Sequence, residues 1–262
     1  MKLCPPEGGV SEDKMKSFGL TDRGKVRKDN QDSFIIEKCT AKDCLIVALC
    51  DGMGGAKAGG VASQLSNRAF VAYIYNKLNS GIGRQVNYRR LLGDACTEAN
   101  GVAYEYSQFS EEFHGMGTTI VGGVIKSNGN GYIINVGDSR AYHVSRRNGS
   151  IIQITRDHSL VEELVAAGTI TREEALHHPR RNVITRAVGT GTKVDADYFD
   201  FFLQSGDALL LCSDGLTNTL SDEEILRCVL ELQTPEEICR SLMAAALERG
   251  ARDNVTVLVV SR

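Results

Sequence analysis

The stretch that decides the fold is 119-TIVGGVIKSNGNGYIINVGDSRAYHV-144. It contains three short apolar runs of strand length, at 119–125, 131–136 and 141–144. The turn 128-NGNG-131 separates the first two runs, and Asn-Gly pairs of this kind favour tight hairpins. A second turn, 146-RRNG-149, leads to a fourth run at 151–154. Consecutive strands joined by tight turns predict an antiparallel sheet.

Outward from this stretch, further strands and several amphipathic helices are predicted. The strands are at 33–37, 44–50, 208–212 and 255–260, and the helices at 61–78, 88–106, 221–230 and 234–248. The last two helices begin with capping-box pairs, Ser221 with Glu224 and Thr234 with Glu237. Because strands gather in hairpins instead of alternating with helices, an α+β fold with antiparallel sheets is favoured over a doubly wound one.

The segment 157–189 breaks the strand pattern. Two short helices are predicted at 159–167 and 171–177, followed by the basic run 178-HPRR-181. An insertion of this length between strands is typical of a lid or flap. Residues 1–15 are expected to be a flexible leader, and 16–262 a single domain without a long linker or repeat.

Composition excludes several classes of protein. The 262 residues carry 30 Lys and Arg against 33 Asp and Glu, a net charge of −3, so nothing predicts nucleic-acid or broad membrane binding. No apolar run approaches the ~18 residues of a membrane span, and the N-terminus lacks the apolar region of a signal peptide. The eight cysteines form no CxxC pair, which argues against zinc, and the expected compartment is the reducing cytoplasm.

Five aspartates fall at the ends of predicted core strands. Asp51, Asp138 and Asp214 follow strands, whereas Asp32 and Asp253 precede them. Crowded carboxylates repel one another unless a cation compensates them. Oxygen ligands without His or Cys point to magnesium or manganese. The Gly52 carbonyl could supply a further oxygen.

Each aspartate also has a simpler interpretation. Asp-Gly after a strand, as in 51-DG-52 and 214-DG-215, is by itself a common turn. Asp253 could cap the following strand, Asp138 could hydrogen-bond backbone amides in its own turn, and Asp32 could belong to a solvated polar turn. Only their joint occurrence favours a metal site, and spacing alone does not show that they converge. Dinucleotide, P-loop and GxSxG motifs are absent from the sequence.

The ordered motifs resemble those of the metal-dependent type-2C serine/threonine protein phosphatases, the PPM family, bacterial branch. They are 24-GKVRKDNQDS-33, 51-DGMGG-55, 115-GMGTT-119, 137-GDSR-140, 212-CSDGL-216 and 253-DNVT-256. The resemblance covers about 18–260 and implies a β-sandwich of two antiparallel sheets flanked by helices (α-β-β-α) with a helical flap. It makes 16–262 the catalytic domain.

The resemblance also implies roles for the site residues. Asp51 would bridge two metals, with the Gly52 carbonyl on one, while Asp214 and Asp253 would complete the other. Asp32 would hold metal-bound water as a catalytic group, and Asp138 with Asp214 would form a third site. Arg27 would bind the substrate phosphate as the second catalytic group. The implied cofactors are two or three Mn²⁺ or Mg²⁺ ions.

The implied reaction is hydrolysis of phosphoserine and phosphothreonine in proteins by direct attack of a metal-bridging hydroxide. Members of this branch often act opposite a membrane Ser/Thr kinase with extracellular PASTA repeats; a monomer is expected. Two positions depart from the family pattern. Met53 stands where many eukaryotic members have His, and Gln31 stands where many have Glu.

Two other functions stay open on the sequence. One is a catalytically silent relative that binds phosphoproteins, although silent relatives usually lose one of the aspartates that are intact here. The other is a related hydrolase acting on a dedicated anti-sigma-factor antagonist or a small phosphate ester. The flap would discriminate between substrates, and its sequence names no ligand.

Overall fold

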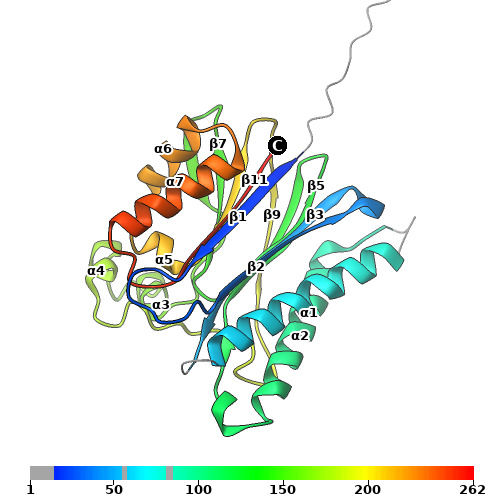
Figure 1. Cartoon of the computed structure of the whole chain (residues 1–262), viewed down its shortest axis with the longest axis vertical. Coiled ribbons are helices and arrows are strands. Elements are labelled where there is room, and N and C mark those ends of the chain that lie inside the picture. The colour runs from blue at the N-terminus through cyan, green and yellow to red at the C-terminus, as the bar shows by residue number, and fades with distance from the viewer. Residues whose placement is uncertain (1–14, 55–57, 81–84) are drawn as a thin grey trace, which may run out of the picture.

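A computed structural model describes residues 15–54, 58–80 and 85–262. The described strands form two antiparallel sheets (Figure 1). The first sheet has the order β1 (Lys16–Asp22), β11 (Val255–Ser261), β10 (Ala208–Cys212), β7 (Arg140–Ser145) and β8 (Ser150–Gln153). The second has the order β2 (Asp32–Cys39), β3 (Cys44–Met53), β5 (Ile120–Lys126), β6 (Asn130–Val136) and β9 (Asp197–Phe202), and β4 (Gly117–Thr118) pairs with the end of β3.

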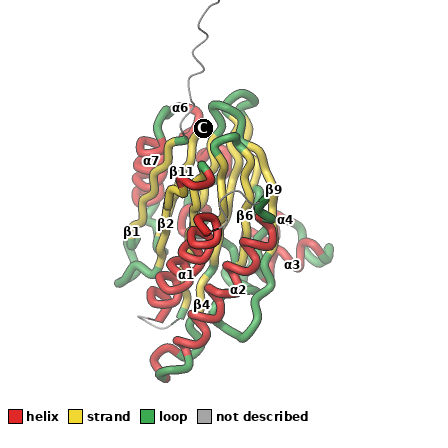
Figure 2. The backbone as a smooth tube through the Cα atoms, turned by 90° about the vertical axis from the view of Figure 1, so that its right-hand side faces the viewer, coloured by secondary structure: helices red, strands yellow, loops and turns green. Residues whose placement is uncertain are grey.

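Helices cover the outer face of each sheet. The second sheet packs against α1 (Ala58–Ser80) and α2 (Tyr88–Ser107), and the first against α5 (Asp214–Thr217), α6 (Asp222–Glu231) and α7 (Pro235–Glu248). The tube view shows the strands running together between these helices (Figure 2). The expected α+β sandwich with flanking helices is confirmed.

The burial of strand β3 explains why its sequence is a continuous apolar run. Its residues Ile46, Ala48 and Cys50 pack toward α1 and α2, while Leu45, Val47 and Leu49 belong to the core between the sheets. Both faces of the strand are therefore buried. A strand buried on both faces needs a continuous apolar run, whereas a strand with one solvent-exposed face alternates apolar and polar residues.

The stretch that decided the prediction forms the expected hairpin. Strands β5 and β6 are antiparallel, with Ile125 opposite Gly131, and the turn is closed by the Gly129 N–H donating to the Lys126 carbonyl at 2.9 Å. β1, β9 and the two-residue β4 were not predicted. β3 also runs past position 50, because Gly52 and Met53 pair with β4, so Asp51 and Gly52 lie inside the strand.

The segment 157–189 contains the two predicted short helices, α3 (Leu160–Ala166) and α4 (Arg172–His177). Its neck is a single antiparallel bridge between Ser159 and Ile184. Two 3-10 helices, η1 (Thr40–Lys42) and η2 (Glu111–Phe113), complete the described elements. The expected leader 1–15 lies outside the described residues except for Met15. Among the described helices, none has the length and apolar character needed to cross a bilayer.

Candidate active site

Asp32 and Asp51 are brought together by the register of the second sheet. They are direct partners on β2 and β3. Asp32 is buried, and its Oδ2 accepts hydrogen bonds from Ser213 Oγ at 2.8 Å and Thr256 Oγ1 at 2.6 Å. Ser213 and Thr256 belong to the first sheet's side of the molecule, so Asp32 links the two halves of the sandwich. Its Oδ1 is buried without a hydrogen-bond partner.

The backbone of Asp51 is held by two threonines. Its N–H donates to Thr119 Oγ1 at 2.9 Å, and its carbonyl accepts from Thr119 N at 2.9 Å and Thr118 Oγ1 at 2.8 Å. The next residue must be glycine, because a Cβ on Gly52 would lie 2.1 Å from the Gly59 carbonyl oxygen at the start of α1. The close approach of β3 and α1 therefore fixes the Asp51–Gly52 segment.

Asp214 and Asp253 come from the other sheet. Asp214 opens α5 directly after β10, and its Oδ2 accepts from Asn218 Nδ2 at 3.0 Å. Asp214 Oδ1 is buried without a hydrogen-bond partner. Asp253 precedes β11, and its Oδ2 accepts from Arg27 Nη2 at 2.7 Å.

Asn254 holds the loop that carries Arg27. Its Nδ2 donates to the carbonyls of Arg23 at 2.9 Å and Asp29 at 3.0 Å, and its Oδ1 accepts from Gln31 N at 2.9 Å. These three bonds fasten both ends of the loop between β1 and β2 beside Asp253. Arg27 is thereby placed at the exposed rim of the carboxylates.

Asp138 lies on the turn after β6, which is tied to the base of the flap. Gly137 adopts a φ of 106°, a conformation that favours glycine. The Gly137 N–H donates to His158 Nδ1 at 3.1 Å, and the Gly137 carbonyl accepts from His158 N at 2.9 Å and Asn135 Nδ2 at 3.1 Å. The buried His158 thus fixes the turn that presents Asp138.

The carboxylates act on one another electrostatically. Burial raises the pKa of Asp32 to about 6, with a further contribution from the charge of Asp214. Burial also raises the pKa of Asp51 well above its usual value, helped by the charges of Asp32, Asp214, Asp138 and Asp253. The pKa values of Asp138 and Asp214 rise to about 8 and about 6, again chiefly by burial. The five aspartates predicted from the sequence therefore do share one electrostatic site.

The donor set fits hard divalent cations. All five charged groups are carboxylates, and Asp32 and Asp214 each keep a buried oxygen with no hydrogen-bond partner. Among residues 15–54, 58–80 and 85–262, no three or more His, Cys, Asp or Glu side chains are placed so that together they could hold a metal ion. Mutually repelling carboxylates with unsatisfied oxygens are the groups that Mg²⁺ or Mn²⁺ would stabilise.

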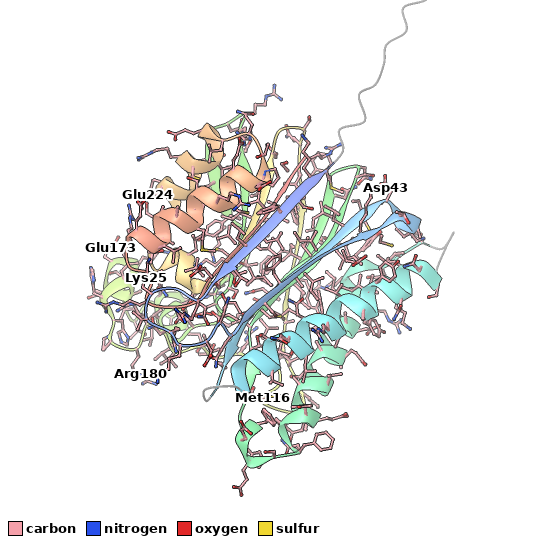
Figure 3. All side chains as sticks on the ribbon, in the orientation of Figure 1. Lys25, Asp43, Met116, Glu173, Arg180 and Glu224 are labelled. Carbon is pink, nitrogen blue, oxygen red and sulfur yellow. The ribbon has the colours of Figure 1, made fainter. Side chains whose placement is uncertain are left out.

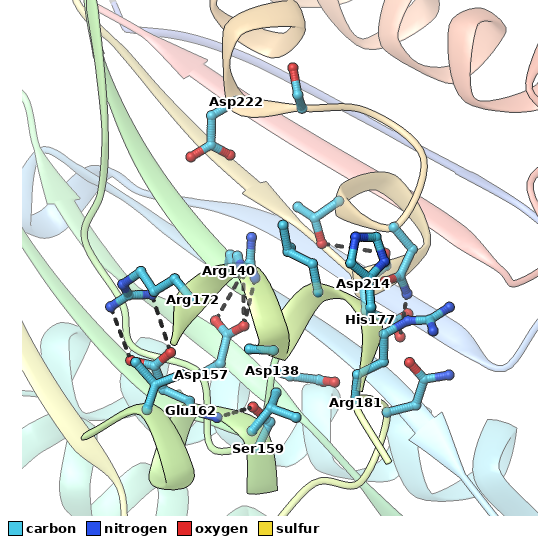
Figure 4. Close-up of a pocket in the computed structure, with 18 of the residues that line it drawn as sticks. Asp138, Arg140, Asp157, Ser159, Glu162, Arg172, His177, Arg181, Asp214 and Asp222 are labelled. Carbon is cyan, nitrogen blue, oxygen red and sulfur yellow. Dashed lines mark hydrogen bonds and ion pairs between the residues drawn. The ribbon is translucent and has the colours of Figure 1, made fainter. Parts of the chain in front are cut away.

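A cavity of about 850 Å³ opens from this site under the flap (Figure 4). Asp138 and Asp214 line it, together with Glu162, Arg172 and His177 from the flap. Arg140 and Asp157 form an ion pair at 2.7 Å within it.

For several residues of the site, no role was predicted from the sequence. Ser213, Thr256, Thr119 and Asn254 each stand in a motif that was recognised, but no role was assigned to them. Only Ser213 and Asn254 stand next to a motif aspartate in the sequence, and Ser213 bonds the distant Asp32, so adjacency gave little signal. His158 gave no such signal, because its partner Gly137 lies 21 positions away.

Comparison with known proteins identifies the family. The family model described as Protein phosphatase 2C matches residues 23–250. The chain belongs to the protein phosphatase 2C family. The serine/threonine phosphatase stp of Listeria monocytogenes serotype 4b is 37% identical over 92% of this chain and 94% of its own. The expected enzyme class, a serine/threonine protein phosphatase, is confirmed by this membership and these relatives.

Solved structures of the family agree with the fold. A bacterial serine phosphatase crystal structure has a TM-score of 0.85 and 39% identity, covering 94% of this chain and 97% of its own. The catalytic domain of the phosphatase PstP, solved in complex with two manganese ions, has a TM-score of 0.79 and 33% identity. The match covers 95% of this chain and 98% of the PstP chain. Members of the family are metal-dependent, as the carboxylate site indicates.

Proposed function

We propose that this protein phosphatase 2C member hydrolyses phosphoserine and phosphothreonine in proteins at the carboxylate site described above. The observation that carries the proposal is the convergence of Asp32, Asp51, Asp138, Asp214 and Asp253 beside Arg27. These residues come from both sheets and from chain positions up to 226 apart. Buried like charges on this scale destabilise the fold unless they bind a cation.

The residues that would hold the ions follow from the donor set. Asp51, the Gly52 carbonyl, Asp214 and Asp253 would bind two Mn²⁺ or Mg²⁺ ions, and Asp138 with Asp214 a third. When bound, such ions acidify water and neutralise charge on a phosphoryl group. Asp32, held by Ser213 and Thr256, would orient the attacking water through its free oxygen.

Arg27 would bind the phosphate group. Its side chain is 57% exposed, and its guanidinium already faces the carboxylates through Asp253. A planar guanidinium can donate to two phosphate oxygens at once, which an ammonium does not match. Met53 has no proton to donate, so the leaving serine or threonine oxygen takes its proton from another donor.

The wider setting is also proposed. Residues 16–262 would be the catalytic domain, with 157–189 as the flap over the cavity, and the enzyme would act as a monomer in the cytoplasm. It would take part in signalling opposite a Ser/Thr kinase of the PASTA type. The cysteine usage and balanced charge support the cytoplasmic setting. A silent, phosphoprotein-binding function is not favoured by relatives named as phosphatases.

Phosphate release from a phosphothreonine peptide tests the proposal. Wild type, Asp214→Asn and Asp43→Asn would be compared with Mn²⁺, with Mg²⁺ and with a chelator. Asp43 is a matched control because it lies at the opposite end of the molecule (Figure 3) and asparagine tolerates its φ of 45°. We expect release only with metal, a loss of about 10²-fold in Asp214→Asn, equal to ~3 kcal/mol of transition-state stabilisation, and no loss in Asp43→Asn.

Two outcomes would count against this proposal. Equal activity of wild type and Asp214→Asn would remove that carboxylate from the reaction. No release by the wild type over a range of metals and pH would favour the silent, binding function.

A further inference from the structure

Three aromatic side chains cluster outside the main cores at the end of α2. The ring of Tyr106 lies 6.1 Å from that of Phe109 and 5.1 Å from that of Phe113, centroid to centroid. Phe109 is 81% exposed, the highest value among the large hydrophobic residues that the structure describes, and Tyr106 is 37% exposed. Phe113 anchors the group, because it packs against the small buried cluster that includes Ala103 and Met116. Exposed aromatics gathered in this way are typical of an interaction surface.

The surroundings of these rings are acidic. Glu105, Glu111 and Glu112 are exposed on the same turn-and-helix segment. Between positions 91 and 125 the sequence contains neither Lys nor Arg. This stretch therefore contributes no cation of its own to offset the negative charge. We call Glu105, Tyr106, Phe109, Glu111, Glu112 and Phe113 the acidic–aromatic surface.

The surface is continuous with the active site through the chain. Directly after it, Met116 leads into β4, which pairs with Gly52 and Met53, and Thr118 and Thr119 then hold the backbone of Asp51. In both ribbon views the end of α2 projects below the sheets, at the end of the molecule where α1 begins (Figures 1 and 2). Met116 is at the same end in the side-chain view (Figure 3). A partner bound here would be held at the end of the molecule that carries β4, which pairs with Gly52 and Met53.

We propose that the acidic–aromatic surface docks a segment of the phosphoprotein substrate that is rich in Lys or Arg and carries a large apolar side chain, away from the phosphorylated residue. The proposal rests on the proposed phosphatase function. The apolar side chain would cover Phe109 and Tyr106, and the cations would contact the aromatic faces and the three carboxylates. An anionic membrane or an acidic peptide would be repelled by the same carboxylates.

Kinetics on matched peptides test this docking. The substrates are a short phosphothreonine peptide, the same peptide extended by a Lys/Arg- and Leu-containing segment, its Glu-containing counterpart, and a small aryl phosphate. We expect the basic extension to raise kcat/KM of the wild type about tenfold (about 1.4 kcal/mol), mainly through KM, and added salt to reduce the gain. Phe109→Ala should abolish most of the gain, and Glu111→Gln with Glu112→Gln should reduce it. All variants should hydrolyse the aryl phosphate as the wild type does.

Ile152→Ala is the matched control, since Ile152 is 61% exposed on β8 of the other sheet. Binding of the unphosphorylated basic segment, measured by calorimetry, does not depend on catalysis. Binding that Phe109→Ala weakens about tenfold would support the surface even in a protein that releases no phosphate. The proposal is overturned if both extensions act alike, if Ile152→Ala behaves as Phe109→Ala does, or if Phe109→Ala lowers aryl phosphate hydrolysis as much as peptide hydrolysis.

Discussion

Arg27 Nη2 donates to Asp253 Oδ2 across 2.7 Å, although the two residues lie 226 positions apart in the chain. The pair is partly open to solvent, with the Arg27 side chain 57% and the Asp253 side chain 33% exposed. The hydrogen bond and charge of Asp253 raise the pKa of Arg27, and the charges of Asp51 and Asp214 add to this. Arg27 therefore remains cationic and is oriented toward the carboxylates before any phosphate arrives.

Replacing Arg27 by lysine should separate charge from geometry. Arg27→Lys keeps the cation but loses the planar fork that can hold both Asp253 and a phosphate oxygen. We expect kcat/KM on a phosphothreonine peptide to fall by about 10- to 100-fold, with KM carrying much of the loss. Arg23→Lys is the control, because Arg23 lies in the same loop and its guanidinium donates to the Lys28 carbonyl instead of to a carboxylate of the site. Equal kinetics of the two variants would exclude phosphate binding by Arg27.

The strands most easily predicted were those buried on both faces. β3, β5, β10 and β11 appear in the sequence as continuous apolar runs, and the structure places them inside the sheets. Strands β1 and β9, which were not predicted, lie at the edges of their sheets and have solvent-exposed faces. Phe202 on β9, for example, is 49% exposed. Edge strands carry charges and interrupted apolar patterns, so local periodicity describes them poorly.

The site was predictable in composition but not in contacts. The motif aspartates could be named from the sequence, because each stands next to a recognisable strand or turn. Their convergence depends on the register that sets Asp32 opposite Asp51 and on the packing of the two sheets. The pairing of Arg27 with Asp253 and the clamp of His158 on Gly137 arise only from tertiary structure. No local pattern reports such long-range contacts.

The stability of the metal-free protein should fall as pH rises from about 4 to about 8. The pKa values of Asp32 and Asp214 are raised to about 6 and that of Asp138 to about 8, from 3.8. Between the unfolded and folded values the folded state binds more protons, so raising the pH removes stability. For Asp32 alone the loss is about 3 kcal/mol, and each kcal/mol shifts Tm by about 2–4 °C in a domain of this size.

Thermal melts from about pH 4 to about pH 8.5 in chelator measure this slope, with Asp32 and Asp214 titrating in its lower part and Asp138 in its upper part. Asp138→Asn should flatten the upper part of the curve, because the group that titrates near pH 8 is removed. Mn²⁺ should raise Tm more at high pH than at low pH, since it binds the deprotonated carboxylates. A chelator curve that is flat, and identical in Asp138→Asn, would contradict this account.

Shortening the flap should separate substrate recognition from the reaction. The structure shows where to cut: Arg140 with Asp157, His158 with Gly137, and the bridge between Ser159 and Ile184 all support the Asp138 turn. Replacing 160–183 by a short turn keeps these contacts, whereas replacing the whole of 157–189 removes them. We expect the shorter excision to leave aryl phosphate hydrolysis within about threefold of wild type and to lower kcat/KM on a phosphoprotein by about tenfold or more.

The longer excision serves as the comparison. It leaves the buried Gly137 N–H without its acceptor, which costs about 1–3 kcal/mol, so Tm and aryl phosphate hydrolysis should both fall. If the 160–183 excision left phosphoprotein kinetics unchanged, the flap would have no part in substrate choice. If it instead damaged aryl phosphate hydrolysis as severely as the longer excision, α3 and α4 themselves would be needed to hold Asp138, and recognition could not be separated from the reaction in this way.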